Sequence, residues 1–355
     1  MAYQDDLYDK LDEQTKDIVK AMPDFASKFF RKIKSKGMSP RTRLQYAYDL
    51  KRFFDFLENS AGFKNENMKT MTAEEVLGRL NNDDIQEYLD TLEYYEVRTK
   101  DGQTRKKRSS EAMKARRISS LRSFYKYYFK TGEITNNLAD LMELPKMHDK
   151  AIVVMERSEV ARMLAAVTDT TGMSEGDIKR HKKIEKRDVA IITLLLGTGI
   201  RVSELVGIDL LDIDYYESSI LVTRKGGDQD EVYFGEEVES ALLEYQEECR
   251  ESLLGEDKKE RAFFLSMHHK RLSVAMVEKM VKGYAEKAGL NMKVTPHSCR
   301  KSFGTAIYNQ TGDIYLVADA LHHSSVETTK RHYAKVNPEH KRIAAKEASS
   351  LLSDD

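Results

Sequence analysis

Helical periodicity runs through nearly the whole chain, and one short stretch departs from it. That stretch, residues 211–234, contains three short runs with β character at about 211–214, 218–223 and 231–234. A Gly-Gly-Asp turn joins the last two runs, as in a hairpin. A chain of 355 residues with so little β sequence is expected to form about two mainly α domains, one with a small antiparallel sheet.

Composition narrows the class of protein. The chain has no Trp. Its hydrophobic fraction of 40% and charged fraction of 33% are typical of an ordinary globular chain. Its longest apolar run, Val189 to Gly197, is far shorter than the ~20 residues of a membrane span, and its acidic start lacks the features of a signal peptide. The cysteines, Cys249 and Cys299, suit a reducing compartment and cannot form a C-x-x-C metal clip. We therefore expect a cytoplasmic protein with no membrane contact, metal or cofactor.

The net charge of −1 hides a strong segregation of charge. Residues 1–20 carry six acids and three lysines, residues 28–52 carry nine Lys or Arg and one Asp, and residues 100–130 carry eleven Lys or Arg and two acids. The two basic stretches favour a nucleic-acid surface and solvated helix faces about equally. The candidate DNA-binding residues in them are Arg41, Arg43, Arg105, Lys106, Lys107, Arg108, Arg116, Arg117 and Arg122.

The first part of the chain is predicted to be an acidic extension at 1–24 and a compact all-helical domain at 25–135. Ser39 and Pro40 form a typical helix start, and KDGQTRKKR at 100–108 is predicted to be a basic loop. The expected helices are 40–57, 72–80, 83–95 and 116–130.

A linker is predicted at 136–152, because this segment contains Pro145 and little periodicity. The second domain, at 153–336, is expected to be mainly α around the small sheet, and the tail at 337–355 to be a short amphipathic helix. The other helices predicted are 158–167 and 187–196, separated by a polar insertion at 169–186, and much of 236–348.

Two segments of the second domain carry polar groups suited to an anion. In LLLGTGIRVSEL, a buried helix is predicted to break at 197–199 and to restart with Arg201 in its first turn, three residues before Glu204. An arginine at a helix N-terminus suits two phosphate oxygens, whereas the alternative is an Arg–Glu pair on a surface helix. In KVTPHSCRKSFGT, His297 and Arg300 lie one turn apart at the head of a helix, a spacing that also arises by chance.

A third segment, LVADALHHSSVETTKRHYAKV, places His322 and His323 before a Ser-Ser turn and Tyr333 ten residues later. Lys225 lies at the hairpin turn. No metal-ligand spacing, Walker loop or G-x-S-x-G motif occurs in the sequence. The informative feature is the ordered set Arg, Lys, His-x-x-Arg, His, Tyr within one domain.

This ordered set, with its flanking sequence, resembles the tyrosine recombinase (phage integrase) family, most closely its Xer-like and transposon-integrase members, over about residues 25–345. The resemblance implies a SAM-like core-binding domain at 25–135 and a catalytic domain with the DNA breaking-rejoining fold at 153–336. It implies a site-specific recombinase that acts on duplex DNA through a 3′-phosphotyrosyl intermediate, as a homotetramer on two DNA sites, with a monomeric free protein left open. Target sequence, accessory partners and biological role stay open.

The resemblance also implies a role for each candidate residue. Arg201, His297, Arg300 and His323 would surround the scissile phosphate, Lys225 would be the hairpin lysine, Tyr333 the nucleophile, and Glu204 a supporting group. The family usually has Gly where this chain has His322, and Arg224 adjoins Lys225. Which member of each neighbouring pair faces the phosphate is therefore open.

Three other functions compete with this one. A type IB topoisomerase-like relaxase would use the same kinds of residue, but the tail and the integrase-like sequence favour a recombinase. A catalytically silent DNA-binding protein of the same fold would not need the intact set of six candidate residues. A helical protein–protein adaptor would hold DNA weakly and with little dependence on salt.

Overall fold

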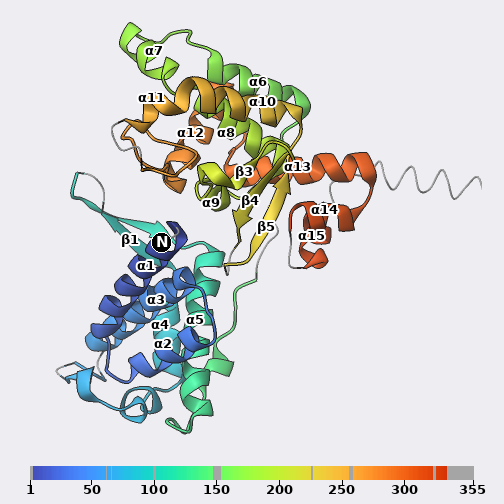
Figure 1. The fold of residues 1–355 in the computed structure, drawn as a ribbon. Helices are drawn as coiled ribbons and strands as arrows, with labels where there is room; N and C mark the ends of the chain where they lie inside the picture. The colour runs from blue at the N-terminus through green and yellow to red at the C-terminus, as the bar shows by residue number, and fades with distance from the viewer. Residues whose placement is uncertain are drawn as a thin grey trace, which may run out of the picture. The chain divides into compact units, whose positions relative to one another are not determined.

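The computed structural model describes residues 3–60, 62–64, 66–98, 101–146, 153–224, 227–255, 259–322 and 325–333. The chain divides into two compact units, residues 1–149 and 150–355 (Figure 1). No helix within the described ranges is long and apolar enough to cross a membrane. The predicted mainly α fold with small antiparallel sheet structure is confirmed.

The first unit is built from helices and one hairpin. Its elements are α1 (Tyr3–Lys20), α2 (Ala26–Ser35), α3 (Pro40–Asn59), a short 3-10 helix (Met68–Thr70), a short π-helix (Glu74–Gly78), α4 (Asn82–Thr91), β1 (Tyr94–Arg98), β2 (Thr104–Arg108), α5 (Glu111–Lys130) and a second 3-10 helix (Leu138–Leu141). The predicted start of α3 is confirmed, since Oγ of Ser39 accepts a hydrogen bond from the backbone N–H of Thr42 and Pro40 is the first helical residue.

Aromatic side chains form the centre of the first unit. The ring of Phe124 on α5 meets those of Phe29 on α2 and Tyr128 edge-on, with centroids 5.1 and 5.0 Å apart. Because large aromatic residues bury much apolar area and favour edge-to-face contacts, this cluster holds α2 and α5 together. The hydroxyl of Tyr128 donates a hydrogen bond to the carbonyl oxygen of Phe25 at 2.5 Å, which satisfies a buried polar group.

The prediction of an all-helical first domain is wrong in one place. Residues 94–98 form β1, which pairs antiparallel with β2 in the segment predicted to be a loop at 100–108. The helix predicted at 83–95 instead ends at Thr91. All five side chains of β2 are exposed, so neither face carries the apolar alternation by which strands are recognised in a sequence.

Both ends of the first unit extend further than the sequence indicated. The acidic extension at 1–24 contains α1, which packs along α3. The predicted linker at 136–152 begins too early, because Leu138, Ala139 and Met142 are buried in the core of the first unit.

The second unit surrounds a buried central helix with other helices and a sheet (Figure 1). Its elements are α6 (Arg157–Thr168), α7 (Glu175–Lys182), α8 (Glu185–Thr198), α9 (Val202–Leu205), a short 3-10 helix (Leu210–Asp212), β3 (Ile213–Asp214), β4 (Ser219–Thr223), β5 (Gln229–Tyr233), α10 (Glu236–Tyr245), a short π-helix (Gln246–Arg250), α11 (Glu251–Leu254), α12 (Val274–Lys287), α13 (Pro296–Thr311), α14 (Ile314–Ala320) and α15 (Val326–Tyr333). Helix α8 packs against α6, α10 and α13.

The three predicted β runs are confirmed as one antiparallel sheet in the order β3-β4-β5, with Ile220 opposite Val232. The polar insertion predicted at 169–186 contains the additional helix α7. The helical prediction for 236–348 fails between α11 and α12, where the described chain forms turns and isolated β-bridges. The tail at 337–355 lies outside the described residues.

Candidate active site

The break after α8 fixes the backbone of the site. Helix α8 ends at Thr198, and Gly199 follows with φ of +61°, in the left-handed region that favours glycine. A Cβ atom on Gly199 would lie 2.5 Å from Cδ1 of Phe303 and 3.0 Å from Cδ2 of Leu321. The predicted break at 197–199 is confirmed, and position 199 requires glycine for both its backbone and its packing.

Arg300 joins this break to the end of α14. Its side chain comes from α13 and the residue is only 5% exposed. Nη1 donates to the carbonyl oxygen of Gly199 at 2.5 Å, and Nη2 donates to the carbonyl oxygen of Leu321. These contacts fix the guanidinium plane, as bidentate recognition of an anion requires. His297, one turn earlier on α13, is exposed.

Arg201 occupies the N-cap of α9, one residue before the first turn in which the sequence predicted it. Its backbone N–H donates to Oε2 of Glu204 at 2.9 Å, and its Nη1 donates to Oε1 at 2.8 Å. Its Nη2 donates to the carbonyl oxygen of His322 at 3.4 Å. The Arg201 side chain is 39% exposed but that of Glu204 only 3%, so the pair is not the solvated surface pair of the alternative interpretation.

Arg224 connects Glu204 to the hairpin of β4 and β5. Its Nη1 lies 2.9 Å from Oε1 of Glu204, and its Nε lies 3.4 Å from Oδ2 of Asp230. The same Oδ2 pairs with Nδ1 of His322. Burial and the neighbouring positive charge of Arg224 lower the pKa of His322. Sequence reasoning missed Asp230, because an acid at the start of a strand has no local signature.

The structure brings together part of the predicted set. Arg300 contacts the carbonyl oxygens of Gly199 and Leu321, and Arg201 contacts that of His322. Glu204 joins this group through its ion pair with Arg201. Lys225 and His323 lie outside the described residues. Tyr333 is the last residue of α15, and its side chain is outside the described part.

Eight of the nine predicted DNA-binding residues fall into two groups. Five of them are exposed: Arg41 at the start of α3, and Arg105, Lys106, Lys107 and Arg108 on β2. Of these five, Arg108 also lies 3.8 Å from Glu93. Three others are less exposed and have acidic partners within the first unit: Arg43 with Asp12 at 2.5 Å, Arg116 with Asp49 at 2.5 Å, and Arg117 with Asp49 at 3.9 Å. Arg43 is only 6% exposed. These three arginines therefore stabilise the unit from within, since a buried carboxylate needs a paired charge.

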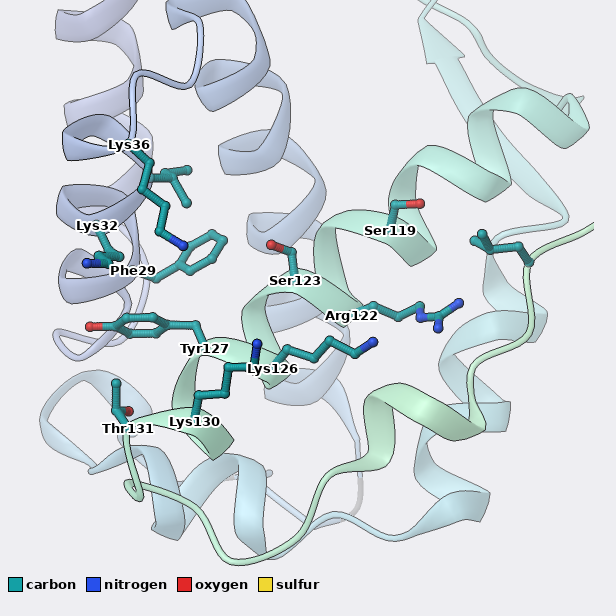
Figure 2. Close-up of a pocket in the computed structure, with 12 residues that line it drawn as sticks. Phe29, Lys32, Lys36, Ser119, Arg122, Ser123, Lys126, Tyr127, Lys130 and Thr131 are labelled. Atoms are coloured by element: carbon teal, nitrogen blue, oxygen red, sulfur yellow. The ribbon is translucent and has the colours of Figure 1, made fainter.

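The ninth residue, Arg122, lines a basic groove between α2 and α5. Figure 2 shows the amino groups around this groove, which come from Lys32 of α2, from Lys36 directly after that helix, and from Lys126 and Lys130 of α5. The rings of Phe29 and Tyr127 contribute to its lining, and its volume is about 520 Å³. Clustered cations of this kind suit a polyanionic chain.

Comparison with known proteins identifies the family. The model of the phage integrase family matches residues 154–340, and that of the phage integrase N-terminal SAM-like domain matches residues 26–132. The chain is 30% identical over 295 residues to tyrosine recombinase XerD of Staphylococcus epidermidis, covering 83% of this chain and 88% of that one. It is 29% identical over 347 residues to tyrosine recombinase XerS of Streptococcus uberis, covering 92% and 95%.

Solved structures share the fold. The XerH site-specific recombinase bound to its palindromic difH substrate matches with a TM-score of 0.64 and 21% identity, covering 88% of this chain and 81% of that one. The Tn1549 transposon integrase in complex with transposon right end DNA matches with a TM-score of 0.60 and 17% identity, covering 90% and 98%. With both family models matched in order along the sequence, this chain belongs to the phage integrase family of tyrosine recombinases.

Proposed function

We propose that this protein is a site-specific recombinase that cleaves and rejoins duplex DNA through a covalent 3′-phosphotyrosyl intermediate. The observation that carries the proposal is the convergence of Arg201 and Arg300 on the backbone of Gly199 and residues 321–322. Two arginines held by buried partners are well suited to the two non-bridging oxygens of a phosphodiester. Integration, excision and dimer resolution would all use this site.

Tyr333 is the proposed nucleophile. Its phenolate oxygen attacks the phosphorus, the bond from phosphorus to the 5′-oxygen breaks, and the 3′-phosphate becomes an ester of the tyrosine. Attack by a 5′-hydroxyl reverses the step. Ionising a tyrosine with the ordinary pKa near 10 costs about 4 kcal/mol at pH 7, so the reaction needs neighbouring groups that take up the proton. We assign this role to His297 and His323.

Arg201 and Arg300 are proposed to stabilise the charge that grows on the phosphate oxygens in the transition state. Because Glu204 and two backbone carbonyl groups already orient these guanidinium groups, they need little reorganisation as the charge develops. Lys225 is proposed to protonate the 5′-oxygen as it leaves. The proposed reaction consumes no nucleotide and requires no metal.

A double-stranded recombination site is the proposed partner. The exposed cations of β2, with Arg41 and the groove that contains Arg122, would contact phosphates and fix the register of the protein on DNA. Recombination requires four strand cleavages, so we propose a homotetramer on two sites, in the cytoplasm at the nucleoid. The tail at 337–355 would dock on a neighbouring subunit. The related fold of lambda integrase has been solved as a tetramer bound to a Holliday junction, with a TM-score of 0.57.

Trapping of the covalent intermediate tests this function. Wild type and Tyr333→Phe are incubated with pooled nicked duplexes from the genomic neighbourhood of the gene, with EDTA present, and examined for an SDS-resistant protein–DNA adduct. Tyr315→Phe is the matched control, because Tyr315 is an exposed tyrosine on α14. We expect the adduct with wild type and Tyr315→Phe but not with Tyr333→Phe. An adduct that survives in Tyr333→Phe would exclude this nucleophile, and salt-sensitive binding without any adduct would favour a silent DNA-binding protein.

A further inference from the structure

Five residues of the second unit form a closed ring of polar contacts. The contacts run from Arg201 to Glu204 at 2.8 Å, from Glu204 to Arg224 at 2.9 Å, from Arg224 to Asp230 at 3.4 Å, and from Asp230 to the imidazole of His322. The carbonyl oxygen of His322 then accepts from Arg201 at 3.4 Å, which closes the ring. The ring joins α9, both sides of the β4–β5 hairpin and the end of α14.

Because two of its members are largely buried, this ring resists separation of the elements that it joins. The side chains of Glu204 and Arg224 are 3% and 11% exposed, so separating them would leave two charges in a poorly solvated place. Arg224 is the member that contacts both carboxylates. These two contacts fix the position of Arg224, which follows β4 directly, relative to Arg201.

His322 is held in an unfavourable backbone conformation within this ring. Its φ of 45° lies in the left-handed region, which is unfavourable for a residue with a Cβ atom. Glycine would avoid that cost but would supply no imidazole to pair with Asp230. A strained backbone that is kept for one side-chain contact points to a role for that contact.

We propose that Asp230 and His322 are positioning residues that lock the β4–β5 hairpin to the segment after α14, and so set the place of the leaving-group acid relative to Arg201. This assignment rests on the proposed function. In the sequence, Lys225 directly follows Arg224 and His323 directly follows His322, so the ring constrains the residue before each of these two candidates. Neither Asp230 nor His322 needs to touch the DNA for this role.

A substrate that needs no leaving-group acid separates positioning from a general loss of structure. In a duplex with sulfur in place of the bridging 5′-oxygen, the 5′-thiolate leaves without protonation, because a thiol is far more acidic than an alcohol. The rate of adduct formation is measured with the oxygen and the sulfur duplexes, both with the site sequence recovered from the trapping assay. The variants are His322→Gly, Asp230→Asn and the double variant. The control is His269→Gly, because His269 is another histidine with positive φ, 58°, in the same unit.

We expect both single variants to bind DNA within about twofold of wild type but to form the adduct at least about tenfold more slowly on the oxygen duplex, a fraction of the 10²–10⁴-fold that general acid catalysis supplies. On the sulfur duplex they should come within about threefold of wild type, and the double variant should be no slower than the slower single variant. His269→Gly should match wild type on both duplexes.

Three results would overturn the assignment: normal rates of the variants on the oxygen duplex, equal slowing on both duplexes, or equal slowing by His269→Gly. Failure of the proposed function looks different, because wild type itself would then form no adduct with either duplex.

Discussion

Nη1 of Arg300 lies 2.5 Å from the carbonyl oxygen of Gly199, so one guanidinium joins two segments that are 101 residues apart in the sequence. The same side chain reaches the carbonyl oxygen of Leu321. A residue proposed to stabilise the transition state is therefore also a crosslink between α8, α13 and α14. Changes at this position should act on both the chemistry and the stability of the second unit.

Arg300→Lys keeps the positive charge but removes the planar guanidinium group, so it tests which of the two the site needs. A lysine ammonium cannot hold both carbonyl groups in the guanidinium geometry, so we expect adduct formation to fall by about 10²–10³-fold. An unsatisfied buried carbonyl should also lower the free energy of unfolding by about 1–3 kcal/mol. Single-turnover kinetics and urea denaturation measure the two effects. The exposed Arg157 at the start of α6 provides the control Arg157→Lys, and equal effects of both substitutions would contradict the prediction.

Gly199→Ala should lower the free energy of unfolding more than Gly172→Ala does, although both glycines have positive φ. At Gly199 the new Cβ meets both unfavourable backbone and the ring of Phe303 at 2.5 Å, whereas at Gly172, with φ of +77°, nothing in the described part of the chain lies within 4 Å. We expect Gly172→Ala to cost about 1 kcal/mol and Gly199→Ala to cost an additional 1–3 kcal/mol, roughly the range for overpacking. Denaturant unfolding measures both, and similar losses would mean that Phe303 yields easily.

Asp12→Asn should destabilise the first unit through Arg43. Asp12 is the carboxylate that pairs with the buried guanidinium of Arg43, and Nε of Arg43 is itself buried without a hydrogen-bond partner among the described residues. Loss of the charge should cost up to about 3 kcal/mol. Asp17→Asn is the control, because Asp17 and Lys20 are both about three-quarters exposed and such pairs contribute at most about 1 kcal/mol. Thermal unfolding of the two variants would refute the prediction if the losses were equal.

Neutralising Lys126 and Lys130 should weaken DNA binding in a way that depends on salt. If both ammonium groups in the groove of Figure 2 bind phosphates, the slope of log K against log salt should fall by about 2, or about 0.9 for each phosphate that the variant no longer neutralises. Fluorescence anisotropy at several salt concentrations measures the slope. Lys64→Ala, at an exposed lysine outside the groove, should leave the slope unchanged. An unchanged slope in Lys126→Ala/Lys130→Ala would remove the groove from the DNA interface.

His322 should make the stability of the second unit depend on pH. Burial and Arg224 hold the pKa of His322 below its usual value, so the folded state binds this proton less readily than the unfolded chain does. The stabilising contribution is complete above the unfolded pKa of about 6.5 and is lost as the pH falls through the folded pKa. Between pH 7 and pH 5, the free energy of unfolding should therefore fall more steeply for wild type than for His322→Gly. Parallel curves in chemical denaturation would refute this.

Local sequence signals predicted the elements whose shape depends on neighbours in the chain. Ser39 and Pro40 fix the start of α3, and the Gly-Thr-Gly segment that ends at Gly199 marks the end of α8. The same signals placed Arg300 near the start of α13 and Arg201 at the start of α9, within one residue of its N-cap position. Caps and glycines act over a few residues, which is why a single sequence reveals them.

Features that depend on distant partners could not be predicted in this way. The exposed strand β2 has no buried face, so its cationic sequence looked like a loop. Arg43 looked like a surface cation because its partner, Asp12, lies 31 residues earlier in a segment set aside as an extension. Asp230 gains its place from Arg224 and His322, which come together only in the folded chain.

The ring and Arg300 together carry an excess positive charge in the free protein. Arg201, Arg224 and Arg300 carry three positive charges, whereas Glu204 and Asp230 supply two negative ones. A phosphodiester brings one negative charge and so completes the balance of this set. The scissile phosphate would then act as a structural counter-ion as well as a reactant, and part of the free energy of DNA binding would be folding free energy of the second unit, recovered when repulsion among its own arginines is relieved.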